Sequence, residues 1–275
     1  MENLVPGINN AINYVESNIM GNLKIGEIAA MAYLSPYYFQ RVFHGLCGMT
    51  IGEYIRKRRL TLAAEELSSS DAKVIDVALK YGYDSPDSFA RAFTKFHGIS
   101  PSSAKSKGAT LRSLAPLKVN LPQEERTFME YKIVEKQAFT LVGFSKTLNS
   151  DNAHSEVPKF WDEHYESGNA EIIKGAFGVC TDSEEKTFDY MIGDIYLPWN
   201  DIPEGCVAKT FPAGTWAVFP FHGACPEAPQ AVGTKIWSEW LPGCKEYAMA
   251  GKYDLEIYFD ETNGEIWIPV KKNDT

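Results

Sequence analysis

The chain has 275 residues, of which 44% are apolar, and a formal net charge of −9. This length is enough for two ordinary domains with their own hydrophobic cores. No run of eighteen apolar residues occurs, and the first residues, MENLVPGINN, lack the basic and then apolar pattern of a secretory signal. We therefore expect a cytoplasmic protein with no membrane partner.

The acidic charge is concentrated in the second part of the chain. Residues 1–108 carry 12 Lys and Arg against 10 Asp and Glu, whereas the remainder carries 15 against 26. The net charge of the whole chain therefore does not argue against binding of nucleic acid by the first part.

The first part contains one pattern twice. After a predicted helix over Leu4–Ile19, a short apolar-periodic segment (Ile25–Ala32) precedes a longer one (Ser35–Gly48). The same order recurs fifty residues later as Val74–Tyr81 and Ser85–Gly98. Each longer segment begins with Ser-Pro, which suits a helix N-terminus, and ends at Gly, which suits a C-terminus. Short helix, turn and longer helix form a helix-turn-helix motif, so we predict an all-α tandem helix-turn-helix domain.

The longer helix of each motif has an apolar face and a polar face at helical spacing. Arg, Gln, Ser and Asp side chains can read base edges in the major groove. The polar faces therefore predict two sets of DNA-binding residues, Tyr37, Gln40, Arg41 and His44 in the first motif and Asp87, Ser88, Arg91 and Lys95 in the second.

A continuous helix over Thr50–Leu67 is predicted between the motifs, where it would fix the spacing of the two reading helices on successive major grooves. It contains the basic run Arg56–Arg59. This run is either a phosphate-binding cluster or an ordinary solvated helix face, and the sequence favours neither.

Residues 4–107 are expected to form the first domain and residues 108–127, which contain Ser, Gly and Pro, a linker that separates two cores. From residue 128 to 272 the apolar period changes to two, and two helices (Glu156–Glu166 and Ala228–Leu241) interrupt the strands. We predict an α+β domain with an antiparallel sheet, its helices on one side and its two halves variants of one unit. The predicted strands are Met129–Glu135, Phe139–Thr147, Gly175–Thr181, Thr187–Leu197, Val207–Pro212, Thr215–Phe221, Asp254–Phe259 and Glu265–Val270.

The end of the chain predicts a ligand pocket. Strand alternation places Glu256 and Tyr258 on one face, and Trp267 of the last strand is expected on the same face, away from the helices. Trp216 is the best further candidate from a central strand. A carboxylate among aromatic rings suits a flat or cationic organic molecule. The alternative is that Glu256 lies on an open, solvated sheet face.

Metal and redox chemistry have little support in the sequence. The five cysteines are scattered without a CxxC motif, and the two His-x-x-Cys pairs lie in different halves of the chain. We expect reduced thiols, no metal and no cofactor. The five histidines are dispersed and form no recognisable catalytic triad.

The tandem motifs, with FQRVF, FARAF and the following GISP, resemble the DNA-binding domain of AraC/XylS-type transcription regulators over residues 4–107. Residues 128–272 resemble the GyrI-like effector-binding domain, through GTWAVFPFHG, WLPG, DLEIYF and EIWIPVKK. The second resemblance implies that a Glu at the position of Glu256 faces a ligand in a hydrophobic cavity. It also implies drug-like, often cationic ligands.

Together these features predict a transcription regulator of the AraC family, an activator in a multidrug or stress response, rather than an enzyme. Its expected partners are double-stranded promoter DNA, a small hydrophobic or cationic effector, and RNA polymerase. Two alternatives remain for the second domain. The resemblance to GyrI-like proteins implies that it could hydrolyse reactive small molecules, with Glu256 and Tyr258 as candidate residues; otherwise it could be a protein-interaction module.

Overall fold

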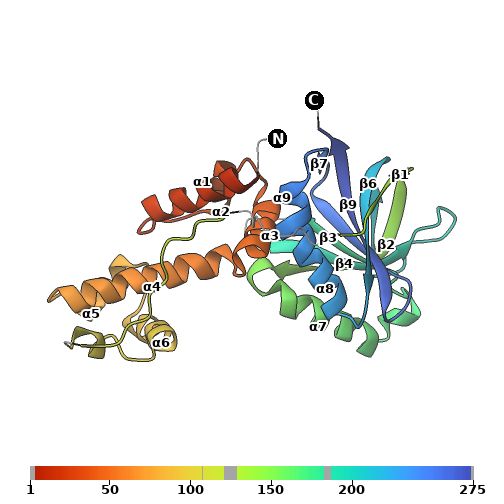
Figure 1. Cartoon of the computed structure of the whole chain (residues 1–275). Helices are drawn as coiled ribbons and strands as arrows, with labels where there is room; N and C mark the ends of the chain where they lie inside the picture. The colour runs from red at the N-terminus through yellow and green to blue at the C-terminus, as the bar shows by residue number, and fades with distance from the viewer. Residues whose placement is uncertain (1–3, 107, 121–128, 183–186, 274–275) are drawn as a thin grey trace.

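The computed structural model describes residues 4–106, 108–120, 129–182 and 187–273. Figure 1 shows a helical half, residues 4–120, beside a sheet-containing half, residues 129–273. Residue 107 of the predicted first domain, residues 121–127 of the predicted linker and residue 128 of the predicted second domain lie outside the described residues. The helical half consists of α1 (Leu4–Ser17), α2 (Ile25–Met31), α3 (Pro36–Cys47), α4 (Ile51–Ser69), α5 (Val74–Lys80), α6 (Pro86–His97) and the 3₁₀ turn η1 (Ser103–Lys105).

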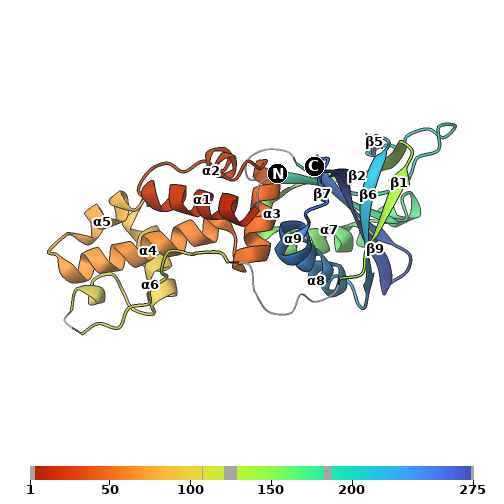
Figure 2. The same cartoon turned by 45° about the horizontal axis from the view of Figure 1, so that its top comes forward.

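Both helix-turn-helix motifs form as the sequence predicts. The Ser35 and Ser85 hydroxyls accept hydrogen bonds from the backbone N–H groups three residues on and so begin α3 and α6. Gly48 and Gly98 end these helices with φ of 67° and 81°, a left-handed conformation that Gly adopts without a Cβ clash. Phe39 and Phe43 of α3 and Phe89 and Phe93 of α6 are fully buried, which fixes the polar faces on the opposite side. Figure 2 shows α4 running from α3 to α5 and α6 at the far end of the molecule.

Two residues of the basic run on α4, Arg58 and Arg59, fit neither of the two interpretations that the sequence allowed. Arg58 is buried and forms an ion pair with Glu16 at 2.8 Å, and it also donates to the Leu114 carbonyl. Arg59 donates to the carbonyl of Ile19, two residues after the end of α1. The side chains of Arg58 and Arg59 therefore hold the helical half together, whereas Arg56 is exposed to solvent.

The sheet-containing half is a single antiparallel sheet with helices on one side. Its helical elements are α7 (Ala153–Glu166), α8 (Glu227–Lys235), the π-helical turn η4 (Ile236–Trp240), α9 (Leu241–Gly243) and the 3₁₀ turns η2 (Ser150–Asn152) and η3 (Asn169–Glu171). Its strands are β1 (Lys132–Lys136), β2 (Phe139–Asn149), β3 (Phe177–Asp182), β4 (Thr187–Ile195), β5 (Val207–Phe211), β6 (Gly214–His222), β7 (Tyr247–Met249), β8 (Tyr253–Tyr258) and β9 (Asn263–Lys272). The short β7 is not among the predicted strands.

The strand order shows an internal repeat. The described strands pair in the order β1-β6-β9-β8-β3-β4-β2-β5, with β7 beside β9. The units β2-α7-β3-β4 and β6-α8-β8-β9 therefore have the same connectivity, and they meet at the central pair of β3 and β8. This arrangement agrees with the prediction that the two halves of the sheet are variants of one unit.

The two faces of the sheet bury different sets of apolar side chains. The face without helices carries a cluster that includes Trp216, Leu255 and Trp267. The helix-covered face carries a larger cluster, and this cluster continues into α1, α2 and α3 of the helical half. The second motif has a separate core around Phe89 and Phe93.

The predicted linker therefore does not separate two cores. The core of the first motif is continuous with that of the sheet, and the boundary between cores lies within the helical half, along α4. The described part of the linker is hydrogen-bonded to the helices: the backbone N–H groups of Leu114 and Leu117 donate to Thr61 and Tyr54 of α4. Among the described residues, no helix is long and apolar enough to cross a membrane.

We predict that Arg58→Ala destabilises the protein, because it leaves the carboxylate of Glu16 partly buried without its charge partner. Removing one partner of a buried ion pair costs about 3–5 kcal/mol, and the 20% exposure of the Glu16 side chain places the expected loss near the lower end. Urea denaturation of the full chain measures it. Arg56→Ala, on the same helix, is the control and should change the free energy of unfolding by less than about 0.5 kcal/mol. Equal losses for the two variants would contradict the structural role of Arg58.

Candidate functional site

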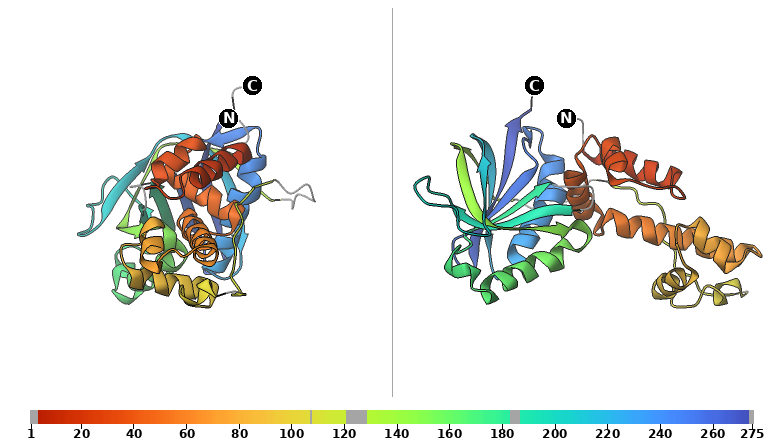
Figure 3. Two further views of the ribbon diagram at one scale, coloured as in Figure 1. Left: turned by 90° about the vertical axis from the view of Figure 1, so that its left-hand side faces the viewer. Right: turned by 180° about the vertical axis from the view of Figure 1, so that it is seen from behind.

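A pocket of about 740 Å³ lies on the helix-covered face of the sheet. Its floor is the central strand pair, with Cys180 of β3 and Glu256 of β8, and its sides come from α7 and α8. Helix α3 of the first motif closes one end. The right-hand view of Figure 3 shows α3 against the sheet-containing half and α4 leading away from it. The pocket is therefore formed by both halves of the chain.

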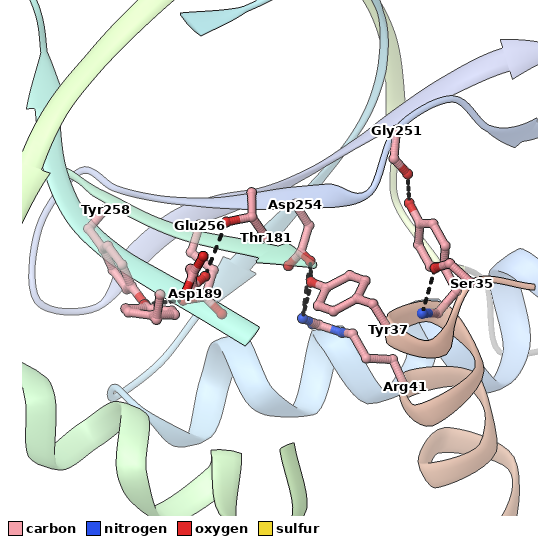
Figure 4. Close-up of polar contacts among 11 residues, drawn as sticks. Ser35, Tyr37, Arg41, Thr181, Asp189, Gly251, Asp254, Glu256 and Tyr258 are labelled. Carbon is pink, nitrogen blue, oxygen red and sulfur yellow. Dashed lines mark hydrogen bonds and ion pairs between the residues drawn. The ribbon is translucent and has the colours of Figure 1, made fainter. Parts of the chain in front are cut away.

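Glu256 is the central polar group of this pocket. Its Oε2 accepts hydrogen bonds from the hydroxyls of Tyr190 and Tyr258, both at 2.9 Å. The indole N–H of Trp161 on α7 donates to the Tyr190 hydroxyl at 3.0 Å. The Trp161 and Tyr258 rings are 5.3 Å apart, edge to face, so the carboxylate lies among aromatic rings. Figure 4 shows Glu256 and Tyr258 on the same strand.

The surroundings of Glu256 favour the protonated, uncharged carboxyl more strongly than bulk water would. Burial raises the pKa of Glu256, the negative charge of Asp254 raises it further, and the hydrogen bonds from Tyr190 and Tyr258 oppose the rise. Burial also raises the pKa of both tyrosines, so they remain neutral hydrogen-bond donors. A cationic ligand would remove part of this penalty by supplying the opposite charge.

The absence of a side chain at Gly178 makes the Tyr190–Glu256 contact possible. Gly178 on β3 pairs with Glu256 on one side and lies beside Tyr190 on the other. A Cβ at this position would lie 2.9 Å from Glu256 Oε2 and would overlap the Tyr190 hydroxyl. The carboxylate and the phenol therefore meet over the bare backbone of β3.

Trp216 and Trp267 do not lie with Glu256. In the register of β8 and β9, Glu256 pairs with Ile266, whereas Trp267 pairs with Leu255. Directly paired residues share a face, so Trp267 is on the side opposite to Glu256. Trp216 contacts Trp267 on that opposite face, with ring centroids 5.9 Å apart. The prediction of a shared face was wrong because Glu256 points toward the helices and not away from them.

The charged side chains around the pocket favour a cation. Carboxylates at the pocket wall outnumber permanent cations: they are Asp162, Glu256, Asp260 and Glu261, against Arg41 and Lys174. Arg41 is moreover neutralised by Asp254, with 3.0 Å between Nη1 and Oδ1. An anionic ligand would meet an excess of negative charge.

The predicted DNA-reading face of α3 is turned toward this pocket. Tyr37, Gln40, Arg41 and His44 all line it. The Tyr37 hydroxyl donates to Asp254 of β8, and the Arg41 guanidinium lies 4.8 Å from the centre of the Trp237 ring. Figure 4 shows Tyr37 and Arg41 both pointing from α3 toward Asp254. His44 Nε2 is 3.0 Å from Nε2 of His154 on α7.

The second reading helix is open by contrast. Asp87, Arg91 and Lys95 are exposed on α6, and Ser88 is half-buried, with its hydroxyl donating to the Ser85 carbonyl. The two predicted DNA-reading faces therefore have opposite environments, although their sequences are variants of one pattern.

Sequence reasoning did not find Asp254, Tyr190 or Trp161 as members of the site. Asp254 alternates in phase with Glu256, which was a usable signal for its face. Tyr190 belongs to a predicted strand and Trp161 to a predicted helix. No local sequence pattern indicates that these two elements contact each other beside β8. Among the described residues, no group of three His, Cys, Asp or Glu side chains could hold a metal ion.

Comparison with known proteins identifies both halves. A family model described as a helix-turn-helix domain matches residues 28–107, and one described as an integron-associated effector binding protein matches residues 132–270. The HTH-type transcriptional activator AarP of Providencia stuartii is 43% identical over 95 residues, which cover 34% of this chain and 70% of AarP. The chain belongs to the AraC/XylS-type transcription regulators.

This regulator is also similar to the right origin-binding protein of Escherichia coli, with 31% identity over 172 residues, or 60% of this chain and 58% of that protein. A solved structure of SAV2435 bound to tetraphenylphosphonium matches 52% of this chain and 94% of its own, with 25% identity and a TM-score of 0.47. The second half of the regulator is a GyrI-like effector-binding domain, so the chain combines DNA binding with sensing of a small molecule.

We predict that Arg91→Ala weakens specific DNA binding by about 1–3 kcal/mol, because a bidentate contact between Arg and guanine discriminates by that amount. Footprinting should show the loss in one half of the site only. Lys80→Ala on α5 is the control, since Lys80 is an exposed cation paired with Glu66 outside the reading face. A footprint that Arg91→Ala leaves unchanged would remove α6 from the DNA interface.

We predict that Gly178→Ala displaces the Tyr190 hydroxyl from Glu256, because the added Cβ takes its place. Binding of a pocket ligand should weaken about as much as in Tyr190→Phe, by about 1–3 kcal/mol for a hydrogen bond to a charged group. Calorimetry on both variants tests this. Full affinity in Gly178→Ala with a loss in Tyr190→Phe would mean that the strand shifts and keeps the contact.

Proposed function

We propose that the effector of this regulator is a hydrophobic organic cation held against Glu256 between α7 and α8. The observation that carries the proposal is a carboxylate that accepts two tyrosine hydroxyls inside an aromatic pocket of about 740 Å³. Ring faces and a partly desolvated carboxylate both attract cations, and the apolar walls favour a ligand with aromatic groups. Trp161, Tyr190 and Tyr258 would surround the charge.

We further propose that the regulator acts in the cytoplasm and contacts RNA polymerase when bound to DNA. The support for polymerase contact is that AarP is by name a transcriptional activator. The predicted division into residues 4–107, 108–127 and 128–272 remains a proposal, with the continuous core of the first motif and the sheet as its main qualification.

A hydrolase is the second candidate for the sheet-containing half. The observation that favours it is the 2.9 Å hydrogen bond between Tyr258 and Glu256, since a carboxylate with a neighbouring phenol can position and deprotonate a water molecule. Incubation of the full chain with reactive esters and epoxides, followed by product analysis, tests it. Turnover that is lost in Glu256→Gln would support hydrolysis over sensing.

We predict that Glu256→Gln weakens binding of tetraphenylphosphonium by about 1–3 kcal/mol, because the substitution keeps the size and removes the charge. Tetraphenylphosphonium is a suitable probe because it is a permanent cation surrounded by four aromatic rings. The neutral triphenylphosphine oxide should lose much less affinity in the same variant. Calorimetry with both ligands measures the difference.

The pH dependence supplies a further readout of the same prediction. Because burial raises the pKa of Glu256, the carboxyl becomes protonated at a higher pH than an ordinary Glu, and affinity for the cation should fall as pH falls through that pKa. The neighbouring tyrosines stay neutral, whereas burial also raises the pKa of Asp254, so protonation of either carboxyl removes negative charge from the pocket as the pH falls. Equal losses for the cation and the neutral ligand in Glu256→Gln would indicate a misfolded pocket. No loss for the cation would place its site elsewhere.

A further inference from the structure

The first reading helix is engaged by the sheet-containing half through the side chains that would read DNA. Tyr37 is 5% exposed, and its hydroxyl is bonded to Asp254. The neighbouring Tyr38 donates to the Gly251 carbonyl just before β8. A helix whose polar face is packed on protein cannot place that face in a major groove at the same time, because both contacts need the same atoms. In this arrangement only α6 has its reading face free.

Arg41 lies in surroundings that suit a cationic ligand. Its guanidinium donates to Asp254 at 3.0 Å and to the Tyr37 hydroxyl at 2.8 Å, and it lies over the rings of Trp237 and Tyr37, at 4.8 and 5.4 Å from their centres. Arg41 is thus surrounded by one carboxylate and two aromatic rings. Glu256 and its aromatic neighbours, two residues farther along β8, offer a cation the same kinds of group. Arg41 also lines the same pocket as Glu256.

We propose that Arg41 is an internal cationic ligand of the effector pocket, and that a hydrophobic cation displaces it and so releases α3 to read DNA. This inference rests on the proposed function, because it assigns to the same pocket the regulation of DNA binding. The first reading helix and the cation are then alternative occupants of one site. Binding of the cation favours the form in which both reading helices are free.

The contact between α3 and the sheet-containing half is close but incompletely satisfied. Gly45 lets α3 approach the π-helical turn η4, since a Cβ there would lie 3.1 Å from Trp237 Cβ and 3.2 Å from the backbone nitrogen of Ser238. Within the described part of the chain, His44 Nδ1, Trp237 Nε1 and Asp254 Oδ2 are buried at this contact without a hydrogen-bond partner. Unsatisfied buried groups weaken an interface, which favours its opening by a competing ligand.

The size of the effect follows from the populations of the two forms. A ligand shifts an equilibrium only by its difference in affinity for the two forms, and by reciprocity DNA binding should strengthen binding of the cation. If the closed form holds about nine tenths of the molecules, complete opening raises apparent DNA affinity about tenfold.

Two variants of the full chain open the contact by different physical means. Asp254→Asn removes the charge that holds Arg41 and leaves α3 unchanged. Gly45→Ala adds a methyl group against Trp237 without changing any charge, and Ala is a better helix former than Gly, so α3 itself is not weakened. Asp189→Asn is the matched control, because Asp189 on β4 bonds Thr147 and does not line the pocket.

The experiment uses duplexes selected from a random pool with Asp254→Asn, and it compares hydroxyl-radical footprints and affinities without ligand. Wild type and Asp189→Asn should protect mainly the half-site that Arg91→Ala identifies with α6. Asp254→Asn and Gly45→Ala should protect both half-sites and bind about tenfold more tightly. Addition of tetraphenylphosphonium to wild type should produce the same extended footprint.

The outcomes separate this inference from the proposed function. Wild-type footprints and affinities in both Asp254→Asn and Gly45→Ala would overturn the inference, and one opened variant is sufficient support if the other fails to fold. If tetraphenylphosphonium binds by calorimetry but leaves the wild-type footprint unchanged, the inference is wrong and the effector site stands. If it does not bind while the variants open, the proposed effector class is wrong, and the role of Arg41 in holding α3 stands.

Discussion

The ion pair between Arg41 and Asp254 joins the two halves of this regulator at the point where each has its functional surface. Arg41 belongs to the face of α3 that the sequence marks for DNA, and Asp254 lies on β8 two residues before Glu256. The Asp254 side chain is 1% exposed, whereas that of Arg41 is 28% exposed. Burial raises the pKa of Asp254 in spite of the opposing effects of Arg41 and the Tyr37 hydroxyl, so the carboxylate depends on its partner to remain charged. If Arg41 leaves, another cation has to compensate this charge or the carboxyl takes up a proton.

The internal repeat of the sheet explains why the pocket lies where it does. Two units of equal connectivity meet at β3 and β8, and each unit contributes one helix to the same face. Residues of both helices and of the two central strands line one pocket at the junction of the units. Glu256 lies on one of these strands and bare backbone, at Gly178, lies opposite on the other. Helix α3 fills one end of the gap with polar side chains. The same repeat that builds the sheet thus leaves room for a ligand and for the reading helix.

Local features of the fold were predictable from the sequence because they depend on neighbouring residues. Ser-Pro at the start of a helix, Gly at its end and strand alternation are properties of a few consecutive residues, and they located both motifs and most strands. The contact between α3 and β8 joins residues 213 positions apart, and no periodicity reports it. For this reason the sequence correctly placed Glu256 and Tyr258 on one face of a strand and assigned that face to the wrong side of the sheet. The structural role of Arg58 was not predictable for the same reason, because its partner Glu16 lies on another helix.

The difference between the two reading helices follows from their neighbours and from a few differing positions, since Tyr37 and Gly45 of α3 correspond to Asp87 and Lys95 of α6. Both have the same caps and the same pair of buried phenylalanines, yet the core behind α3 continues into the sheet, and the core behind α6 is separate. Helix α4 connects the two cores. Near the middle of α4, Arg58 forms an ion pair with Glu16 of α1 and donates to the Leu114 carbonyl. We therefore expect a movement of α3 away from β8 to carry α1 and α4 with it, and with α4 the helix α6 at its far end. A change in one buried ion pair can in this way alter the position of a reading helix that has no contact with the pocket.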